Sequence, residues 1–169
     1  ELVRFSLGCA RMQKRWDYLR AFVHPDNAAS RRVLEKCGFE PLDYAVMSDD
    51  AEPLLERVRQ ALDDGIDCIM TVGGTGISPR DITVDTLAQL ITMPMPGIME
   101  AGRAFGQRRT PYALMSRGVA GLAGPRGRSL IMTLPGSRGG ATETLQAVLP
   151  GLIHLFDCRD AFQHAGGYE

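Results

Sequence analysis

An apolar run that ends in a glycine-rich turn constrains this chain more than any other stretch. The run Ile66–Val72 is followed by Gly73, Gly74, Thr75 and Gly76, then by Ile77-Ser78-Pro79 and finally by Arg80-Asp81. A nearly continuous apolar run of this length predicts a central, buried strand. Glycine permits positive φ and close approach of a ligand, and bare backbone N–H groups attract anions. We therefore predict a phosphate-binding turn at the carboxyl end of a buried strand.

Strand and helix patterns alternate along the first half of the chain. Strands are predicted at Leu2–Leu7, Leu42–Val46 and Ile66–Val72. One helix between them is capped by Asp26 or Asn27 and stopped by Gly38, and the next places apolar side chains three to four residues apart, at Leu54, Leu55, Val58 and Leu62. The order β-α-β-α-β predicts an α/β fold with helices on both faces of a mostly parallel sheet.

The second half continues with alternating elements. Helices are predicted at Asp81–Ile91, Ile98–Arg108 and Ala141–Phe156, where Pro150 should kink or divide the last one. Strands are predicted at Tyr112–Met115 and Ser129–Leu134. Prolines and glycines predict a loop and a turn region, at Thr92–Gly97 and Gly118–Gly127, and the end of the chain is a polar tail, Asp157–Glu169.

Composition excludes several classes of protein. The 169 residues fit one domain, and 44% apolar and 23% charged residues are typical of a soluble globular protein. A net charge of −1 gives no indication of nucleic-acid binding, and neither a membrane-length apolar run nor a secretory leader is visible. The chain does not begin with methionine, which suggests a trimmed or partial sequence. No cysteine pair has CxxC spacing, so we expect free thiols in a reducing cytoplasm, at Cys9, Cys37, Cys68 and Cys158.

Three predicted strand ends carry similar small and hydroxyl-bearing residues. One runs into Gly73–Gly76, the second into Ser116-Arg117-Gly118 and the third into Pro135-Gly136-Ser137. Carboxyl ends of parallel strands meet at one edge of a sheet, so the three segments should converge on one ligand. Each alone is equally consistent with an ordinary loop, whereas three together favour a phosphate or nucleotide site.

Two aspartates and two arginines accompany these loops. Asp49 and Asp81 follow strand ends, and paired carboxylates beside a phosphate are suitable ligands for Mg²⁺. The alternative for both is an ordinary helix cap. Arg80 and Arg117 carry the charge to bind phosphate, although surface arginine is the usual interpretation.

The blocks Thr71–Thr83, Thr110–Gly121 and Leu134–Ser137 resemble, in this order, the signatures of the molybdopterin-binding adenylyltransferase family, relatives of the G domain of gephyrin. Tyr44–Asp50 is similar to the strand and acidic turn that precede them in the family. The resemblance covers about Gly38–Phe156. It implies a three-layer α/β/α domain that is commonly trimeric and acts in molybdenum cofactor biosynthesis.

The resemblance also implies ligands and roles. Members bind molybdopterin, and the active ones transfer AMP from Mg-ATP to its terminal phosphate. Asp49 and Asp81 match the acids that serve magnesium and catalysis. The other matching positions would bind pterin and phosphate: Gly73, Gly74, Thr75, Gly76, Ser78, Arg80, Ser116, Arg117, Pro135, Gly136 and Ser137. A molybdate-inserting enzyme of the same pathway is an expected partner.

The first 40 or so residues depart from the family pattern. Ser6-Leu7-Gly8-Cys9 and the basic stretch Arg11–Arg20 stand where the family has a serine-aspartate turn and a glycine-containing loop. This departure favours an alternative function, a molybdopterin carrier or scaffold with little or no transferase activity. His24–Ser30 with Leu34–Phe39 also resembles the last motif of GNAT acetyltransferases. We interpret it as a capped helix whose likeness is coincidental or grafted, and we expect no working acetyltransferase.

Overall fold

The computed structural model describes residues 50–124 and 127–160. The strands predicted at Leu2–Leu7 and Leu42–Val46, and the helix that Gly38 should stop, lie outside these residues. Within them the elements follow in the order α3 (Ala51–Asp63), β1 (Cys68–Val72), α4 (Thr83–Ala88), β2 (Ile91–Pro94), α5 (Pro96–Gly106), the 3₁₀ helix η1 (Pro111–Met115), β3 (Ala120–Ala123), β4 (Ser129–Leu134) and α6 (Arg138–Asp160).

The described strands form one sheet in the order β1-β4-β3-β2. Strands β1 and β4 are parallel, with Cys68 opposite Leu130 and Val72 opposite Leu134. Strand β3 runs antiparallel to both of its neighbours. The described sheet is therefore mixed. The connection between β3 and β4 is as short as a hairpin, and such a short connection can join only antiparallel strands. The predicted α/β class is confirmed, but the predicted mostly parallel arrangement does not hold for the described strands, because two of their three pairings are antiparallel.

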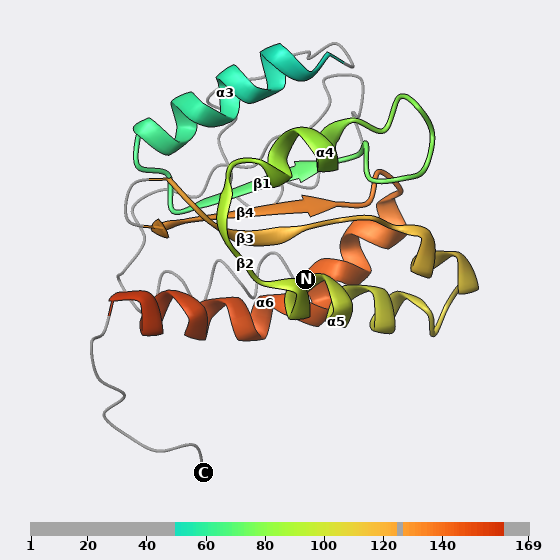
Figure 1. Ribbon diagram of the computed structural model, residues 1–169. Coiled ribbons are helices and arrows are strands. Elements are labelled where there is room, and N and C mark those ends of the chain that lie inside the picture. Colours follow the sequence, from blue (N-terminus) through green and yellow to red (C-terminus); the bar gives the residue numbers. More distant parts are fainter. Residues whose placement is uncertain (1–49, 125–126, 161–169) are drawn as a thin grey trace, which may run out of the picture.

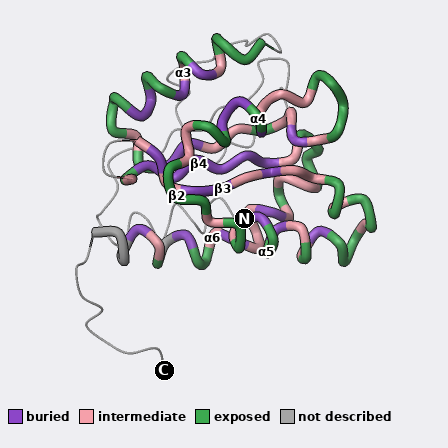
Figure 2. The backbone as a smooth tube through the Cα atoms, viewed as in Figure 1, coloured by how far each residue is buried: buried purple, intermediate pink, exposed green. Residues whose placement is uncertain are grey.

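Helices cover both faces of this sheet, with α3 and α4 on one side and α5 and α6 on the other (Figure 1). Strand β4 is buried along its whole length, as Figure 2 shows. Its side chains alternate between the two faces, as a pleated strand requires. Ile131 packs in a cluster with residues of α3 and α4, whereas Leu130, Met132 and Leu134 pack in a cluster with residues of α5 and α6. Two apolar cores thus fix the position of β4.

Two segments have a different secondary structure from the one predicted. The loop predicted at Thr92–Gly97 is wrong, because its first half belongs to strand β2 and its last two residues begin helix α5. Strand β2 pairs only with β3 within the described sheet, and an edge strand tolerates proline. The strand predicted at Tyr112–Met115 is wrong as well. This segment is the 3₁₀ helix η1. The Thr110 side chain caps its start by accepting a hydrogen bond from the Tyr112 N–H, and Pro111 is well suited to the first position of a helix.

Glycine and proline had other roles than the sequence indicated. The turn region predicted at Gly118–Gly127 is wrong where strand β3 lies. Gly121 lies within this strand. Glycine is needed there because β2 approaches closely: a Cβ at position 121 would lie 2.4 Å from the Ile91 Cγ2 atom. Pro150 lies inside α6 without dividing it. Its ring is exposed, so water can hydrate the carbonyl that its missing N–H leaves free.

No helix in residues 50–124 and 127–160 combines the length and the apolar character that a membrane crossing requires.

The contact between α5 and α6 gives a stability prediction. A Cβ on Gly102 would lie 2.7 Å from the Thr144 Cγ2 atom, whereas one on Gly97, in the same helix, would meet nothing within 4 Å. Alanine in place of glycine in a helix is worth up to about 1 kcal/mol, but overpacking costs roughly 1–3 kcal/mol. Gly102→Ala should therefore lower the free energy of unfolding in urea, and Gly97→Ala should leave it equal or raise it. Stabilisation by both substitutions would contradict the packing of α5 on α6.

Candidate functional site

Two glycine-rich loops lie side by side at the carboxyl ends of β1 and β4. The strands are parallel neighbours and end opposite each other, at Val72 and Leu134. The Gly73 N–H donates to the Leu134 carbonyl over 3.0 Å. A Cβ on Gly136 would lie 3.2 Å from the Gly73 Cα. The two loops therefore touch through their backbones, and a side chain at position 136 would crowd Gly73, whereas a Cβ on Gly73 would lie 3.9 Å from the Gly136 Cα.

The first loop turns sharply at two glycines with positive φ. Gly73 has φ of +106° and Gly74 has φ of +65°. Position 74 also lacks space for any side chain, because a Cβ there would lie 2.1 Å from the Thr83 Oγ1 atom. The start of α4 thus packs directly on the turn, and only glycine satisfies both conditions at this position.

Backbone donors are left free in both loops. Within the described residues, the N–H groups of Gly74, Thr75, Gly76 and Ile77 donate no hydrogen bond, and the same holds for Gly136 and Ser137. Backbone N–H groups in folded proteins are nearly always paired, with protein, water or a ligand. Adjacent runs of free donors therefore form a surface suited to an anion.

Asp81 closes the far end of the turn. Its Oδ2 atom accepts a hydrogen bond of 2.8 Å from the Ser78 N–H, and the Asp81 N–H donates to the Ser78 carbonyl over 2.9 Å. The carboxylate lies against Gly76, where a Cβ would be 2.8 Å from Oδ2. The Oδ1 atom has no hydrogen bond among the described residues. The carboxylate is thus fixed in direction while one oxygen stays open to a ligand.

Arg117 holds the turn from the side. Its backbone N–H donates to the Thr75 carbonyl over 2.8 Å. Its Nε donates to the Gly76 carbonyl over 2.7 Å and its Nη2 to the Asp81 carbonyl over 2.7 Å. The Nη1 atom lies 3.0 Å from both carboxylate oxygens of Asp85 in α4. Every nitrogen of the guanidinium is engaged, so in this structure Arg117 shapes the turn rather than facing a ligand.

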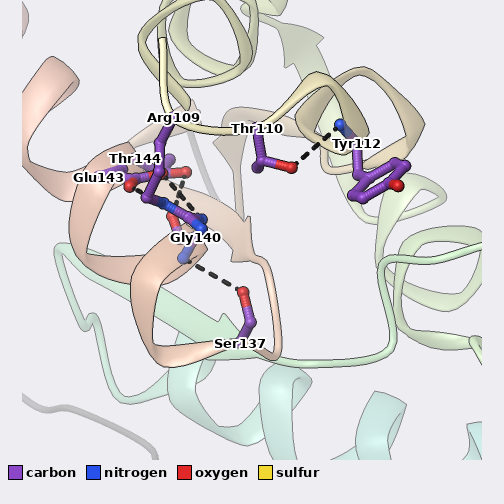
Figure 3. Close-up of polar contacts among 7 residues, drawn as sticks. All are labelled: Arg109, Thr110, Tyr112, Ser137, Gly140, Glu143 and Thr144. Carbon is purple, nitrogen blue, oxygen red and sulfur yellow. Dashed lines mark hydrogen bonds and ion pairs between the residues drawn. The ribbon is translucent and has the colours of Figure 1, made fainter. Parts of the chain in front are cut away.

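A cavity of about 150 Å³ lies on the other side of this segment, between α5, η1 and the start of α6. Ser116, Pro135 and Ser137 contribute to its wall, and so do residues of α5 and η1. Figure 3 shows the Ser137 hydroxyl at the first turn of α6, where it accepts from the Gly140 N–H over 3.2 Å. The predicted site residues therefore divide between the glycine turn and this hydroxyl-lined cavity.

An ion pair closes one end of the cavity. The Arg109 guanidinium reaches across to the Glu143 carboxylate of α6 and makes two hydrogen bonds with it (Figure 3). The hydrogen bond and the charge of Glu143 raise the pKa of Arg109 above its usual value. The positive charge of Arg109 is thus paired with the carboxylate of Glu143. Arg103 lines the same cavity and donates only to backbone carbonyls among the described residues.

The remaining predicted residues lie as follows. Thr75 is buried, and Arg80 is exposed with its N–H 3.3 Å from the Ser78 Oγ atom. Asp49 lies outside the described residues, so its pairing with Asp81 stays a prediction. In residues 50–124 and 127–160, no three His, Cys, Asp or Glu side chains gather into a group that could hold a metal ion.

Sequence reasoning missed the charged residues of the cavity wall, of which Arg103 and Glu143 lie on helices and Arg109 in the turn after α5. Arg103, Arg109 and Glu143 were not among the predicted site residues, although all three line the cavity. Charged residues on helices are usually solvated, so their type gave no signal. Thr110 did lie inside one of the recognised blocks, and its cap on η1 could have been inferred from Thr110-Pro111.

The structure shows an α/β/α domain with two glycine-rich loops at the carboxyl ends of β1 and β4 and a cavity beside them. Known proteins share this fold. Residues 27–154 match the sequence model of a family described as "Probable molybdopterin binding domain". The molybdopterin biosynthesis enzyme MoaB from Thermus thermophilus has a crystal structure that is 38% identical, with 89% of each chain covered and a TM-score of 0.65.

Two curated relatives agree with this match. Molybdenum cofactor biosynthesis protein B of Staphylococcus carnosus is 34% identical over 69% of this chain and 68% of its own length. A molybdenum cofactor biosynthesis bifunctional protein of Chlorobaculum tepidum is 33% identical over 82% of this chain. The chain belongs to the molybdopterin-binding domain family, which confirms the resemblance seen in its three blocks.

The matches also show where the chain differs from its relatives. It spans only 43% of the length of the bifunctional protein. Residues 1–40 match the model of an acetyltransferase (GNAT) domain, which agrees with the likeness noted at His24–Ser30 and Leu34–Phe39. The atypical first segment therefore resembles a second family, and its structure lies outside the described residues.

The turn gives a prediction that separates strain from collision. Gly65 and Gly74 both have positive φ, but a Cβ on Gly65 would meet nothing within 4 Å. An L-residue in this conformation costs roughly 1–2 kcal/mol, so Gly65→Ala should lower the free energy of unfolding by about that amount. Gly74→Ala carries the same strain and adds the collision with Thr83, so chemical denaturation should show a clearly larger loss. Equal losses in the two variants would contradict the packing of Thr83 on the turn.

Proposed function

We propose that the protein binds molybdopterin and transfers AMP from Mg-ATP to the terminal phosphate of the pterin, as a step of molybdenum cofactor biosynthesis in the cytoplasm. The main support for this proposal is the pair of touching loops with free N–H donors, at Gly74–Ile77 and at Gly136-Ser137. Both loops belong to blocks of the molybdopterin-binding family. Adenylyl transfer joins two phosphates, and such a reaction needs donors placed around both.

The backbone donors would carry most of the binding. Phosphate oxygens accept hydrogen bonds from free N–H groups, and these groups neither titrate nor move with a side-chain rotamer. The Ser116 and Ser137 hydroxyls line the neighbouring cavity and can donate to a pterin or a further phosphate. Arg80, which is exposed beside the turn, would add charge at its rim.

Asp81 would supply a carboxylate oxygen to magnesium. Its Oδ1 atom is free of hydrogen bonds among the described residues, and a single hard oxygen beside phosphates fits Mg²⁺, which prefers carboxylate and phosphate ligands. Asp49 would supply the second carboxylate. When bound, the metal would neutralise charge on the reacting phosphates. The pterin phosphate oxygen would form the new bond to the α-phosphorus of ATP, and pyrophosphate would leave.

A molybdopterin carrier or scaffold is the second candidate function. Residues 1–40 match an acetyltransferase family, and this is the segment in which the serine-aspartate turn is missing. A site without that loop would still hold the pterin through the described loops while lacking part of the machinery for ATP.

Self-association is a further expectation. The described residues expose several large apolar side chains, among them Tyr112 and Leu114 of η1, at 71% and 62%. Exposed apolar patches often mark protein interfaces. We propose that the chain forms a homotrimer or a higher oligomer and delivers its product to a molybdate-inserting enzyme.

The proposal predicts a specific effect of Asp81→Asn. Asparagine keeps an oxygen that can accept from the Ser78 N–H but loses the charge, so the turn should persist. Pyrophosphate release from Mg-ATP and molybdopterin should fall by about 100-fold or more, because removing one preorganised electrostatic group costs that much in comparable sites. Molybdopterin affinity should stay within about threefold, since backbone groups do most of the binding.

Asp63→Asn, at the exposed end of α3, is the matched control and should leave turnover unchanged. Tight molybdopterin binding by the unchanged protein without any adenylylated product would eliminate the enzyme and leave the carrier. Equal turnover by the Asp81→Asn variant would show that this carboxylate takes no part in the transfer.

A further inference from the structure

Arg103 lies behind the segment that carries Arg117. It belongs to α5 and is half-buried. Its Nη1 atom donates to the Gly118 carbonyl over 3.2 Å and to the Ser116 carbonyl over 3.4 Å. Among the described residues it makes no ion pair. A half-buried arginine that serves only two backbone carbonyls must have a role in holding that backbone.

The two carbonyls lie on either side of residue 117 in the sequence. Ser116 has extended backbone angles, with φ of −69° and ψ of 120°. Along extended chain, the backbone groups of residues i and i+2 point the same way and those of residue i+1 point the opposite way. The carbonyls of Ser116 and Gly118 face Arg103, and the Arg117 N–H accordingly faces the Thr75 carbonyl at 2.8 Å. The segment therefore lies between α5 and the glycine turn.

Tight packing prevents this segment from shifting toward α5. A Cβ on Gly118 would lie 2.8 Å from both the Met99 Cε atom and the Thr133 carbonyl oxygen. Met99 and Arg103 are four residues apart in α5 and so lie on the same face of the helix. The Val119 N–H, next in the chain, donates to the Thr133 hydroxyl over 2.8 Å. Arg103 is the polar contact of α5 with a segment that is otherwise held by close packing.

The geometry points to Arg103 as a positioning residue for the glycine turn. It fixes the carbonyls of Ser116 and Gly118, so that Arg117 is directed away from α5 and into the turn, where it holds the carbonyls of Thr75, Gly76 and Asp81. Arginine suits this task because its planar guanidinium has several donors in a fixed fork, whereas lysine offers a point charge on a flexible stem. The effect on a ligand rests on the proposed function, but the effect on the turn does not.

Hydrogen exchange tests the inference without any ligand. Peptides that contain Ser78 and Asp81 report on the turn, because both backbone N–H groups are hydrogen-bonded there. Arg103→Met keeps an apolar stem and removes the donors. Exchange at Ser78 and Asp81 should become about tenfold faster, which corresponds to one to two lost hydrogen bonds. Arg103→Lys should lie between this variant and the unchanged protein, and it carries the test if Arg103→Met does not fold.

Arg108→Met is the matched control. Arg108 follows the same helix, is exposed and stacks its guanidinium on the Phe105 ring, 5.1 Å from the ring centroid. Its loss should leave exchange at Ser78 and Asp81 unchanged. If Arg103→Met accelerates exchange only in α5, or if both variants accelerate it equally in the turn, Arg103 is an ordinary structural residue and the inference is wrong.

A double-mutant cycle shows whether Arg103 acts through Arg117. In an Arg117→Met background the turn has already lost its clamp, so adding Arg103→Met should change its exchange by less than about twofold. Additive effects of the two substitutions would contradict the inference. Molybdopterin affinity, measured in the same variants, should weaken about tenfold for Arg103→Met. If the unchanged protein binds no molybdopterin, the proposed function fails while the exchange results still decide the role of Arg103.

Discussion

The contact between Arg117 and the glycine turn is the interaction on which the site depends. The turn joins β1 to α4 and consists mainly of glycines and small polar residues, which have few side-chain contacts of their own. Arg117 supplies the missing contacts from a segment 41 residues away from Gly76 in the sequence. It binds three carbonyls of the turn and an acid of α4, so the turn has one shape as long as Arg117 stays in place.

In this arrangement, the groups that hold the turn in place differ from the groups that remain available to a ligand. The carbonyls of the turn face Arg117, and this leaves the N–H groups of Gly74–Ile77 for a ligand. The second loop contributes its own free donors through the backbone contact of Gly73 with Gly136. Side chains therefore fix the loops, and backbone groups present the charge-complementary surface. A surface made in this way would require little rearrangement on binding an anion, since its donors are already in position.

Much of the fold followed from local patterns in the sequence, and two of the errors had a common cause. Strand β4 was predicted because burial on both faces gives a continuous apolar run, and helix α3 was predicted because burial on one face gives apolar residues at helical spacing. The errors at β2 and β3 arose where glycine or proline was taken for a turn residue, whereas η1 was taken for a strand although Thr110-Pro111 is typical of a helix start. Gly121 instead permits two strands to approach closely, and such a reason lies in residues distant in the sequence.

The site could be predicted in part for a similar reason. The glycines, hydroxyls and Asp81 were found because their types are unusual at strand ends. Arg117 was named, but its task as a clamp depends on partners 32 to 41 residues away that no local pattern reveals. Arg103 and Glu143 escaped notice because charged residues on helices are common. Composition and spacing thus indicate a candidate ligand site, and they say little about which residues keep it in shape.

A structure of the protein with molybdopterin bound tests the central claim most directly, which is that both glycine loops form one ligand site. We expect a terminal phosphate that accepts hydrogen bonds from N–H groups of Gly74–Ile77 or Gly136-Ser137, with the pterin in contact with both loops and Arg117 still on the carbonyls of the turn. A ligand that contacts neither loop, or a turn that opens and releases Arg117 on binding, would contradict it.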